Sequence, residues 1–195
     1  QGVKDLRIAY SPALGYAKHI HPEIAAATAQ AAQHLQDLGA VVEQVDPGIE
    51  DPLDITTGLW FAGAYQVWRT LSKEQQALTD PDFAAQAAIG ETLDANALHQ
   101  LNQRRGLLGS HLRQFMQRFD LILTPSTAVP AFKALPAGHS AMNSEAMLGW
   151  TPFSYPFNLS QQPAISLPCG LTKDGLPMGV QLVGPMFGDA LVLRV

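Results

Sequence analysis

The sequence has only one cysteine, so it cannot form an internal disulfide. This absence agrees with a reducing compartment, and we expect the protein to be cytoplasmic. Basic residues are also few, because 12 Lys and Arg stand against 17 Asp and Glu and give a formal net charge of -5. Nucleic-acid phosphates are bound by clustered Lys and Arg, which the sequence lacks, so we expect no nucleic-acid partner.

Long hydrophobic runs are absent as well. No apolar stretch approaches the roughly 20 residues that a membrane-spanning helix needs, so we expect no membrane association. No repeat, low-complexity tract or Ser/Gly linker divides the chain. With 47% hydrophobic and 15% charged residues, the chain can bury a substantial core, and we expect a single domain over residues 1–195.

The first part of the chain has the pattern of a strand, a helix and a second strand. Residues 6–10 and 41–45 are short apolar runs that are typical of strands. Between them, Pro22 fits the first position of a helix, and Gly39 fits the position just after its end. Two strands joined by such a crossover helix are parallel, so the pattern predicts a βαβ unit.

Further helices and strands follow along the chain. Helical spacing of apolar residues predicts helices over about residues 51–71, 81–89 and 94–118, which we expect to cover a sheet. Residues 164–167 and 178–183 are near-continuous apolar runs, which are typical of inner strands covered on both faces. An Asp-Gly pair between them favours a hairpin turn. The sequence thus predicts a mixed α/β fold in which helices cover a twisted sheet.

Four segments carry a resemblance to a known family. Two lie close together, namely NLSQQPAISLPCG at residues 158–170 and DGLPMGVQLVGP at residues 174–185. Two earlier segments, LRIAYSPAL at residues 6–14 and DLILTPSTAVPAF at residues 120–132, follow the same order as in the family. Together they resemble the carboxy-terminal portion of the amidase signature hydrolases. The resemblance implies the amidase signature fold and, for the whole enzyme, hydrolysis of a small-molecule carboxylic amide to an acid and ammonia or an amine.

The resemblance also implies a catalytic apparatus that this sequence lacks. Enzymes of the family use a nucleophilic Ser in a Gly/Ser-rich loop, a second Ser in a cis peptide and a Lys, and they need no metal or organic cofactor. None of the nine serines lies in such a loop. A helical pattern that starts at Asp189 also stops at Val195. We therefore expect the carboxy-terminal half of an amidase, without its catalytic amino-terminal part and inactive alone.

Arg105 is a candidate substrate-binding residue. It aligns with a position where glutamine-amidotransferase relatives in that family place an Arg, which would pair with a substrate carboxylate. The alternative is that Arg104 and Arg105 only decorate a solvated helix face. The acidic residue that those relatives carry near Thr151 is absent, which argues against a glutamine-like substrate and favours a plainer amide.

Hydroxyl side chains follow a strand predicted at residues 121–123. Thr124, Ser126 and Thr127 lie at its carboxyl end, where open α/β sheets usually bind ligands, so they are candidates to line a pocket. Alternatively, they satisfy local backbone groups, as small hydroxyl residues commonly do. Trp60 is a further candidate, as the apolar wall of a pocket for the acyl group. The alternative is that Trp60 and the aromatic residues near it form ordinary core.

Two other kinds of site are suggested by histidines and by the cysteine. His19 and His21 would support a metal if they stood on a strand, but they precede Pro22 in a loop with no second ligand cluster nearby, so we expect no metal. Cys169 has no histidine close in sequence, so we expect a small buried residue at a strand end and not a nucleophile.

Two alternative functions stay open. Besides the amidase interpretation, the chain could be a non-catalytic binding or assembly module, or it could be the A-type subunit of a tRNA-dependent amidotransferase complex. If the sheet continues in polypeptide that is not present, this chain has an unpaired strand edge and an uncovered apolar face. We therefore expect the chain to self-associate through that surface.

Overall fold

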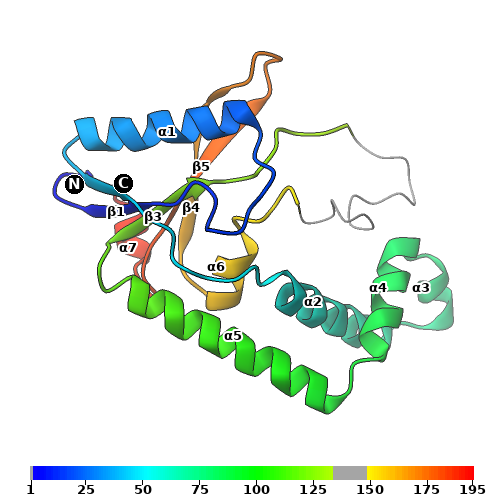
Figure 1. The fold of residues 1–195 in the computed structure, drawn as a ribbon. Coiled ribbons are helices and arrows are strands. Elements are labelled where there is room, and N and C mark those ends of the chain that lie inside the picture. The colour runs from blue at the N-terminus through cyan, green and yellow to red at the C-terminus, as the bar shows by residue number, and fades with distance from the viewer. Residues whose placement is uncertain (1, 134–148) are drawn as a thin grey trace.

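The computed structural model describes residues 2–133 and 149–195, which form a mixed α/β fold around a five-stranded sheet (Figure 1). The strands are β1 (Arg7–Tyr10), β2 (Val41–Gln44), β3 (Leu121–Pro125), β4 (Ala164–Leu171) and β5 (Pro177–Val183). The helices are α1 (Pro22–Asp37), α2 (Leu53–Trp68), α3 (Lys73–Ala77), α4 (Pro81–Glu91), α5 (Ala95–Phe115), α6 (Tyr155–Ser160) and α7 (Asp189–Val192). The strand order across the sheet is β2-β1-β3-β5-β4. The expected fold class is confirmed.

The predicted βαβ unit is present. β1 pairs in parallel with β2 on one side and with β3 on the other. Pro22 is the first residue of α1, where its missing N–H leaves no hydrogen bond unmade. Gly39 follows the end of α1 with a φ of +95°, a left-handed conformation that glycine adopts without strain.

The predicted hairpin joins β4 to β5. The Gly175 N–H donates to the Thr172 carbonyl at 2.9 Å, and Gly175 has a φ of +78°. β5 then pairs antiparallel with both β3 and β4, so it is an inner strand as predicted. The sheet is therefore parallel on the β1 side and antiparallel on the β5 side.

The expectation that residues 164–167 form an inner strand is wrong. Among the described residues, β4 lies at the edge of the sheet and pairs with β5 alone. Its side chains alternate between exposed and half-buried positions until the strand's end. The apolar run does not reveal this position, because a short apolar run is compatible with burial on one face as well as on two.

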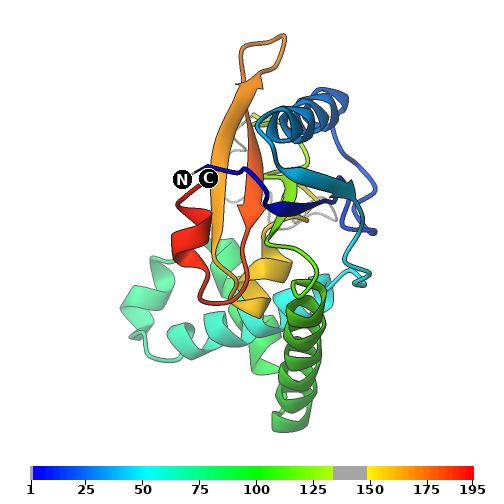
Figure 2. The ribbon, with the colours of Figure 1, turned by 90° about the vertical axis from the view of Figure 1, so that its left-hand side faces the viewer.

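The core lies on both faces of the sheet. α1 covers one face, and α5 and α6 lie on the other (Figures 1 and 2). On the first face, Leu121 and Leu123 of β3 pack in one cluster with residues of α1. On the second face, Ile122 packs in another cluster with Leu112 of α5 and Phe157 of α6. β3 is thus buried on both sides and forms the centre of the fold.

The helices α2, α3 and α4 form a helical arm (residues 53–91) that does not cover the sheet, contrary to expectation. α2 packs against α4, α5 and α6, while α3 and α4 project away from the sheet (Figure 1). Gly90 of α4 lies so close to α2 that an added Cβ would lie 1.9 Å from the Phe61 carbonyl oxygen. None of the described helices, in the arm or elsewhere, combines the length and apolar character that a membrane crossing requires.

Candidate functional site

A pocket of about 490 Å³ lies where the helical arm meets α5 and α6. Gly58 on α2 allows α5 to come close, because a Cβ there would lie 2.6 Å from Cδ1 of Leu101. The pocket brings together two of the predicted residues, Trp60 and Arg105. Its lining residues are Thr56, Thr57, Leu59, Trp60, Arg105, Trp150, Thr151, Ser154, Tyr155, Asn158 and Leu159.

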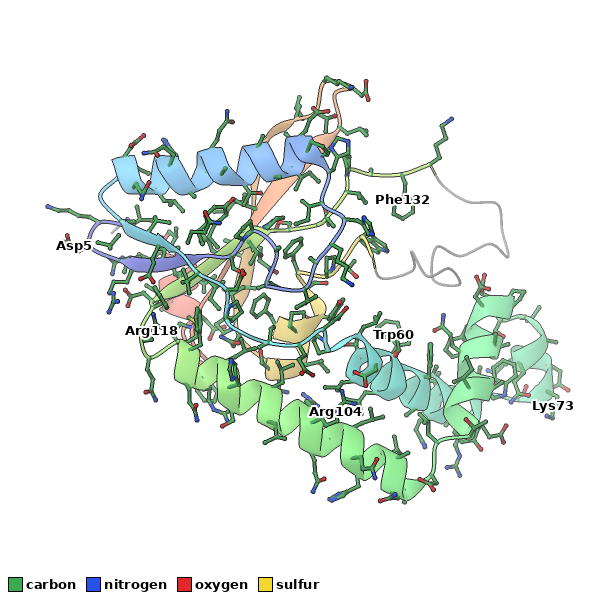
Figure 3. The ribbon with its side chains drawn as sticks, viewed as in Figure 1. Asp5, Trp60, Lys73, Arg104, Arg118 and Phe132 are labelled. Carbon is green, nitrogen blue, oxygen red and sulfur yellow. The ribbon has the colours of Figure 1, made fainter. Side chains whose placement is uncertain are left out.

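Arg105 and its neighbour Arg104 have different surroundings. The Arg105 Nε donates to the carbonyl oxygen of Leu159, at the end of α6, over 2.8 Å. Within residues 2–133 and 149–195 we find no carboxylate paired with Arg105. Arg104 lies between α5 and α2 (Figure 3). It forms a two-pronged ion pair with Asp54 of α2, which lowers the pKa of Asp54. Only Arg104 therefore fits the alternative of a solvated helix face.

Trp60 is not a core residue, although it lies on a helix with other aromatic side chains. Its side chain lines the pocket and is 57% exposed. The indole Nε1 donates to Oε1 of Gln86 on α4 at 2.9 Å. The alternative that these aromatic residues form ordinary core therefore fails for Trp60, whereas Trp68 does pack against Phe83 of α4 with ring centroids 6.2 Å apart.

Two tyrosines, Tyr155 in the pocket's lining and Tyr16 next to it, attach the α6 side of the pocket to the rest of the fold. The Tyr155 hydroxyl donates to Asp51 at 2.7 Å, and the Tyr16 hydroxyl donates to the Pro152 carbonyl at 2.5 Å. The two rings stack with centroids 6.3 Å apart. Burial raises the pKa of Tyr16 and of Tyr155 well above the ordinary value, so both hydroxyls stay protonated as hydrogen-bond donors.

Thr124, Ser126 and Thr127 lie at the carboxyl end of β3 as predicted, but none of them lines this pocket. Thr124 is fully buried, and its hydroxyl donates to the Pro125 carbonyl at 2.9 Å. The Thr127 hydroxyl donates to the Val129 carbonyl at 3.0 Å. The Ser126 Oγ lies 2.6 Å from Oγ of Ser166 on β4. The contacts of Thr124 and Thr127 favour the alternative in which the hydroxyls satisfy local backbone groups, whereas Ser126 contacts a side chain of another strand.

The metal and cysteine hypotheses receive no support from the geometry. In the part of the chain that the structure describes, no three His, Cys, Asp or Glu side chains come together as a metal site. Cys169 is not at a strand end and not fully buried, contrary to expectation, because it lies within β4 at the edge of the sheet. Burial nevertheless raises the pKa of its thiol, which disfavours the nucleophilic thiolate.

Comparison with known families decides where the chain belongs. The sequence pattern of the family described as Amidase matches residues 1–193. The chain belongs to the amidase family. The resemblance to amidase signature hydrolases that the four sequence segments carry is therefore confirmed.

This amidase chain is similar to an acylamidase of Rhodococcus erythropolis, with 31% identity over 198 residues that cover 98% of this chain and 41% of that protein. It is also 36% identical to the A-type subunit of the glutamyl-tRNA(Gln) amidotransferase of Myxococcus xanthus over 91 residues, which cover 47% of this chain and 18% of that protein. Among solved structures, a bacterial aryl acylamidase of the amidase signature family matches with a TM-score of 0.82 and 26% identity, over 100% of this chain and 43% of that chain. The chain thus spans less than half the length of these relatives.

Three residues at or next to the pocket could not be predicted from the sequence. Trp150 lies just before α6 and Tyr155 is the first residue of α6, a helix of six residues that is too short to show helical periodicity. The Nε1 of Trp150 is buried and has no hydrogen-bond partner among the described residues. Gln86 accepts the hydrogen bond of the Trp60 indole, and no local sequence pattern links two residues that are 26 positions apart.

Proposed function

We propose that the chain forms the substrate-binding part of an amidase that hydrolyses a small carboxylic amide to an acid and ammonia or an amine. The observation that carries the proposal is the 490 Å³ pocket, in which aromatic, aliphatic and small polar side chains surround an Arg that has no carboxylate partner among the described residues. Small-molecule sites commonly combine an apolar lining with a few polar groups that fix the ligand's orientation. An amide has the matching parts, namely an apolar body and a polar carbonyl group.

The reacting groups are proposed to lie on polypeptide outside these 195 residues. A Ser Oγ attacks the amide carbon, the C–N bond breaks, and a second Ser with a Lys passes the proton to the leaving amine. Backbone N–H groups stabilise the oxyanion, and water then releases the acid from the acyl-enzyme. The one close Ser pair that we describe, Ser126 and Ser166, has no Lys hydrogen-bonded to it within the described residues. Ser140 and Ser144 lie outside the described residues.

The catalytic part of the proposal is tested with the full natural protein that carries this sequence. We expect it to hydrolyse simple aryl or aliphatic amides, and a serine-directed inhibitor to abolish the activity. The 195-residue chain alone should show no turnover. An inactive full protein, or an isolated chain with inhibitor-sensitive turnover, would contradict the proposal.

Arg105 is proposed to hold the polar end of the substrate, as a donor to its carbonyl or carboxylate oxygen. Hydrogen bonds to a charged group contribute about 1.5–3 kcal/mol, so Arg105→Ala should raise KM of the full protein by about tenfold to a hundredfold. Arg104→Ala is the matched control, because Arg104 neighbours Arg105 but pairs with Asp54 on the surface. Equal effects of the two substitutions on KM would exclude this role for Arg105.

The amidotransferase alternative is favoured by one observation, the 36% identity to the A-type subunit of a glutamyl-tRNA(Gln) amidotransferase over 91 residues. Thr151, which lines the pocket in place of the expected acidic residue, argues against a glutamine-like substrate. Release of ammonia from glutamine by the full protein would favour this alternative over the plainer amide. Under the main proposal the enzyme works in the cytoplasm without a nucleic-acid partner, as its single cysteine and its net charge of -5 suggest.

The assembly alternative concerns the edge of the sheet. The outer side of β4 pairs with no strand in the described residues, and residues 164–171 carry no charged side chain that would discourage pairing. A mostly apolar cavity of about 310 Å³ lies beside it, between α1 and the sheet. We therefore propose that the 195-residue chain self-associates through this side. Light scattering at increasing concentration tests this, and a clean monomer throughout would contradict it.

A further inference from the structure

Gln86 does not line the pocket, yet it holds one of the pocket's walls in place. It lies on α4 and is only 7% exposed, and its Oε1 accepts the hydrogen bond from the indole Nε1 of Trp60. An indole nitrogen can only donate, and Gln86 provides the acceptor. The orientation of an otherwise exposed Trp60 therefore depends on a residue from another helix.

The position of Gln86 is itself fixed by the packing of α4 on α2. At Gly90, one turn further along α4, the backbones of the two helices come so close that only a glycine fits against Phe61. This contact leaves α4 little freedom to slide along α2. The contact at Gly90 therefore fixes the position of Gln86, and the hydrogen bond from Trp60 to Gln86 fixes the orientation of the indole ring.

An aromatic ring that is held in one orientation can discriminate between flat and puckered groups of a bound substrate. Trp60 lines the pocket together with Trp150 and Tyr155. Aromatic rings attract other flat rings in offset-stacked or edge-to-face geometry, and this attraction requires a defined ring orientation. A side chain that changes rotamer freely would contact flat and puckered groups about equally.

We propose that Gln86 is a positioning residue that makes the pocket selective for amides with a flat aromatic group, by fixing the indole ring of Trp60. This inference rests on the proposed function, because it deepens the substrate class of the same pocket. Gln86 acts through Trp60 and touches no substrate. It should therefore affect substrate binding and leave the chemical step unchanged.

A purely structural role for Gln86 makes a different prediction. If Gln86 only attached α4 to α2, other hydrogen bonds between these helices would matter as much. Tyr65 provides the matched control, because its hydroxyl donates from α2 to Glu91 of α4 at 3.2 Å, and neither residue lines the pocket. Tyr65→Phe removes that hydrogen bond and leaves Trp60 and Gln86 intact.

The experiment compares benzamide with cyclohexanecarboxamide, which has a ring of similar size that is not flat, as substrates of the full natural protein. Gln86→Leu should raise KM for benzamide about 2- to 10-fold, the range that an aromatic pair contributes, and change kcat by less than about twofold. KM for cyclohexanecarboxamide should change less than about twofold in the same variant. Tyr65→Phe should change neither KM.

A double-mutant cycle with Trp60→Phe then tests whether Gln86 acts through Trp60. Trp60→Phe keeps a ring but loses the Nε1 donor, so it should raise KM for benzamide, and adding Gln86→Leu should change KM little further. Trp60→Phe also carries the test if Gln86→Leu fails to fold. The inference is wrong if both amides respond equally, if Tyr65→Phe has the same effect, or if the two substitutions are additive. A wild-type protein that hydrolyses neither these two nor other simple aryl or aliphatic amides would refute the proposed function itself, and this inference with it.

Discussion

The sheet and the helical arm are held together in different ways. All five residues of β3 are buried, and clusters of large apolar side chains pack on both of its faces. In the arm, α2 buries only Ile55 and Ala64, and α3 buries no residue. The arm is held by the close backbone contact at Gly90, by the packing of Trp68 against Phe83 and by hydrogen bonds between α2 and α4. The sheet therefore provides most of the stability, whereas the arm presents side chains that a ligand can reach.

The largest effect on stability should come from the centre of the sheet. Leu123→Ala removes a fully buried side chain, and we expect it to lower the free energy of unfolding by about 2–5 kcal/mol. Val67→Ala on α2 is the matched control in the arm, where Val67 is 53% exposed and the expected loss is below about 0.5 kcal/mol. Urea denaturation measures both. Similar losses in the two variants would remove the distinction between sheet and arm.

A smaller effect is expected at the contact between α4 and α2. Gly90→Ala would place a Cβ against the Phe61 carbonyl, so we expect α4 to shift and stability to fall by about 1–3 kcal/mol. At Gly63, on the same arm, an added Cβ meets no atom within 4 Å, so Gly63→Ala should stabilise α2 by about 0.5–1 kcal/mol. Thermal unfolding with circular dichroism compares the two. If Gly90→Ala were as well tolerated as Gly63→Ala, the two helices would not be tightly docked.

The smallest effect concerns the ion pair that joins the arm to α5. Arg104 lowers the pKa of Asp54, so the pair stabilises the fold above the unfolded pKa of about 4, and this contribution is lost as the pH falls through the lower folded pKa. Both side chains are largely exposed, so Asp54→Asn should cost about 0.3–0.5 kcal/mol at pH 7.

The pH dependence gives this prediction its control. As the pH falls through the lowered folded pKa of Asp54, the carboxyl group becomes protonated in the folded as well as the unfolded chain, so wild type and Asp54→Asn should approach the same stability in urea. Glu43→Gln affects a looser surface pair with Arg118, at 3.8 Å, and should cost less at pH 7. A difference for Asp54→Asn that is as large below that folded pKa as at pH 7 would show that the ion pair is not its cause.

Much of the sheet could be predicted from the sequence, because its signals are local. Pro22 and Gly39 mark the two ends of α1, and the Asp-Gly pair before Leu176 marks the hairpin. The edge position of β4 could not be predicted, because it depends on which strands pair with it and not on its own composition. That α3 and α4 project away from the sheet could not be predicted for a similar reason, because helical spacing does not show what a helix packs against.

In the candidate site, too, features with a local sequence signal could be predicted and features that depend on tertiary contacts could not. An aligned position makes Arg105 a candidate and its aromatic character makes Trp60 one, and both line the pocket, while their roles stay predictions. Thr124 was correctly placed at a strand end, but its hydroxyl is engaged within the core, which a strand pattern cannot reveal. The contribution of Gln86 depends on a hydrogen bond between two helices, and only the folded structure brings its two partners together.

The proline in the middle of β4 has a consequence for any association through that edge. Pro168 has no N–H to donate, and the pairing register with β5 shifts between Pro168 and Gly170. A neighbouring strand could therefore follow only a short stretch on either side of this interruption. We expect docking along β4 to stop at small closed assemblies and not to extend into fibrils, because the interruption recurs in every copy that joins.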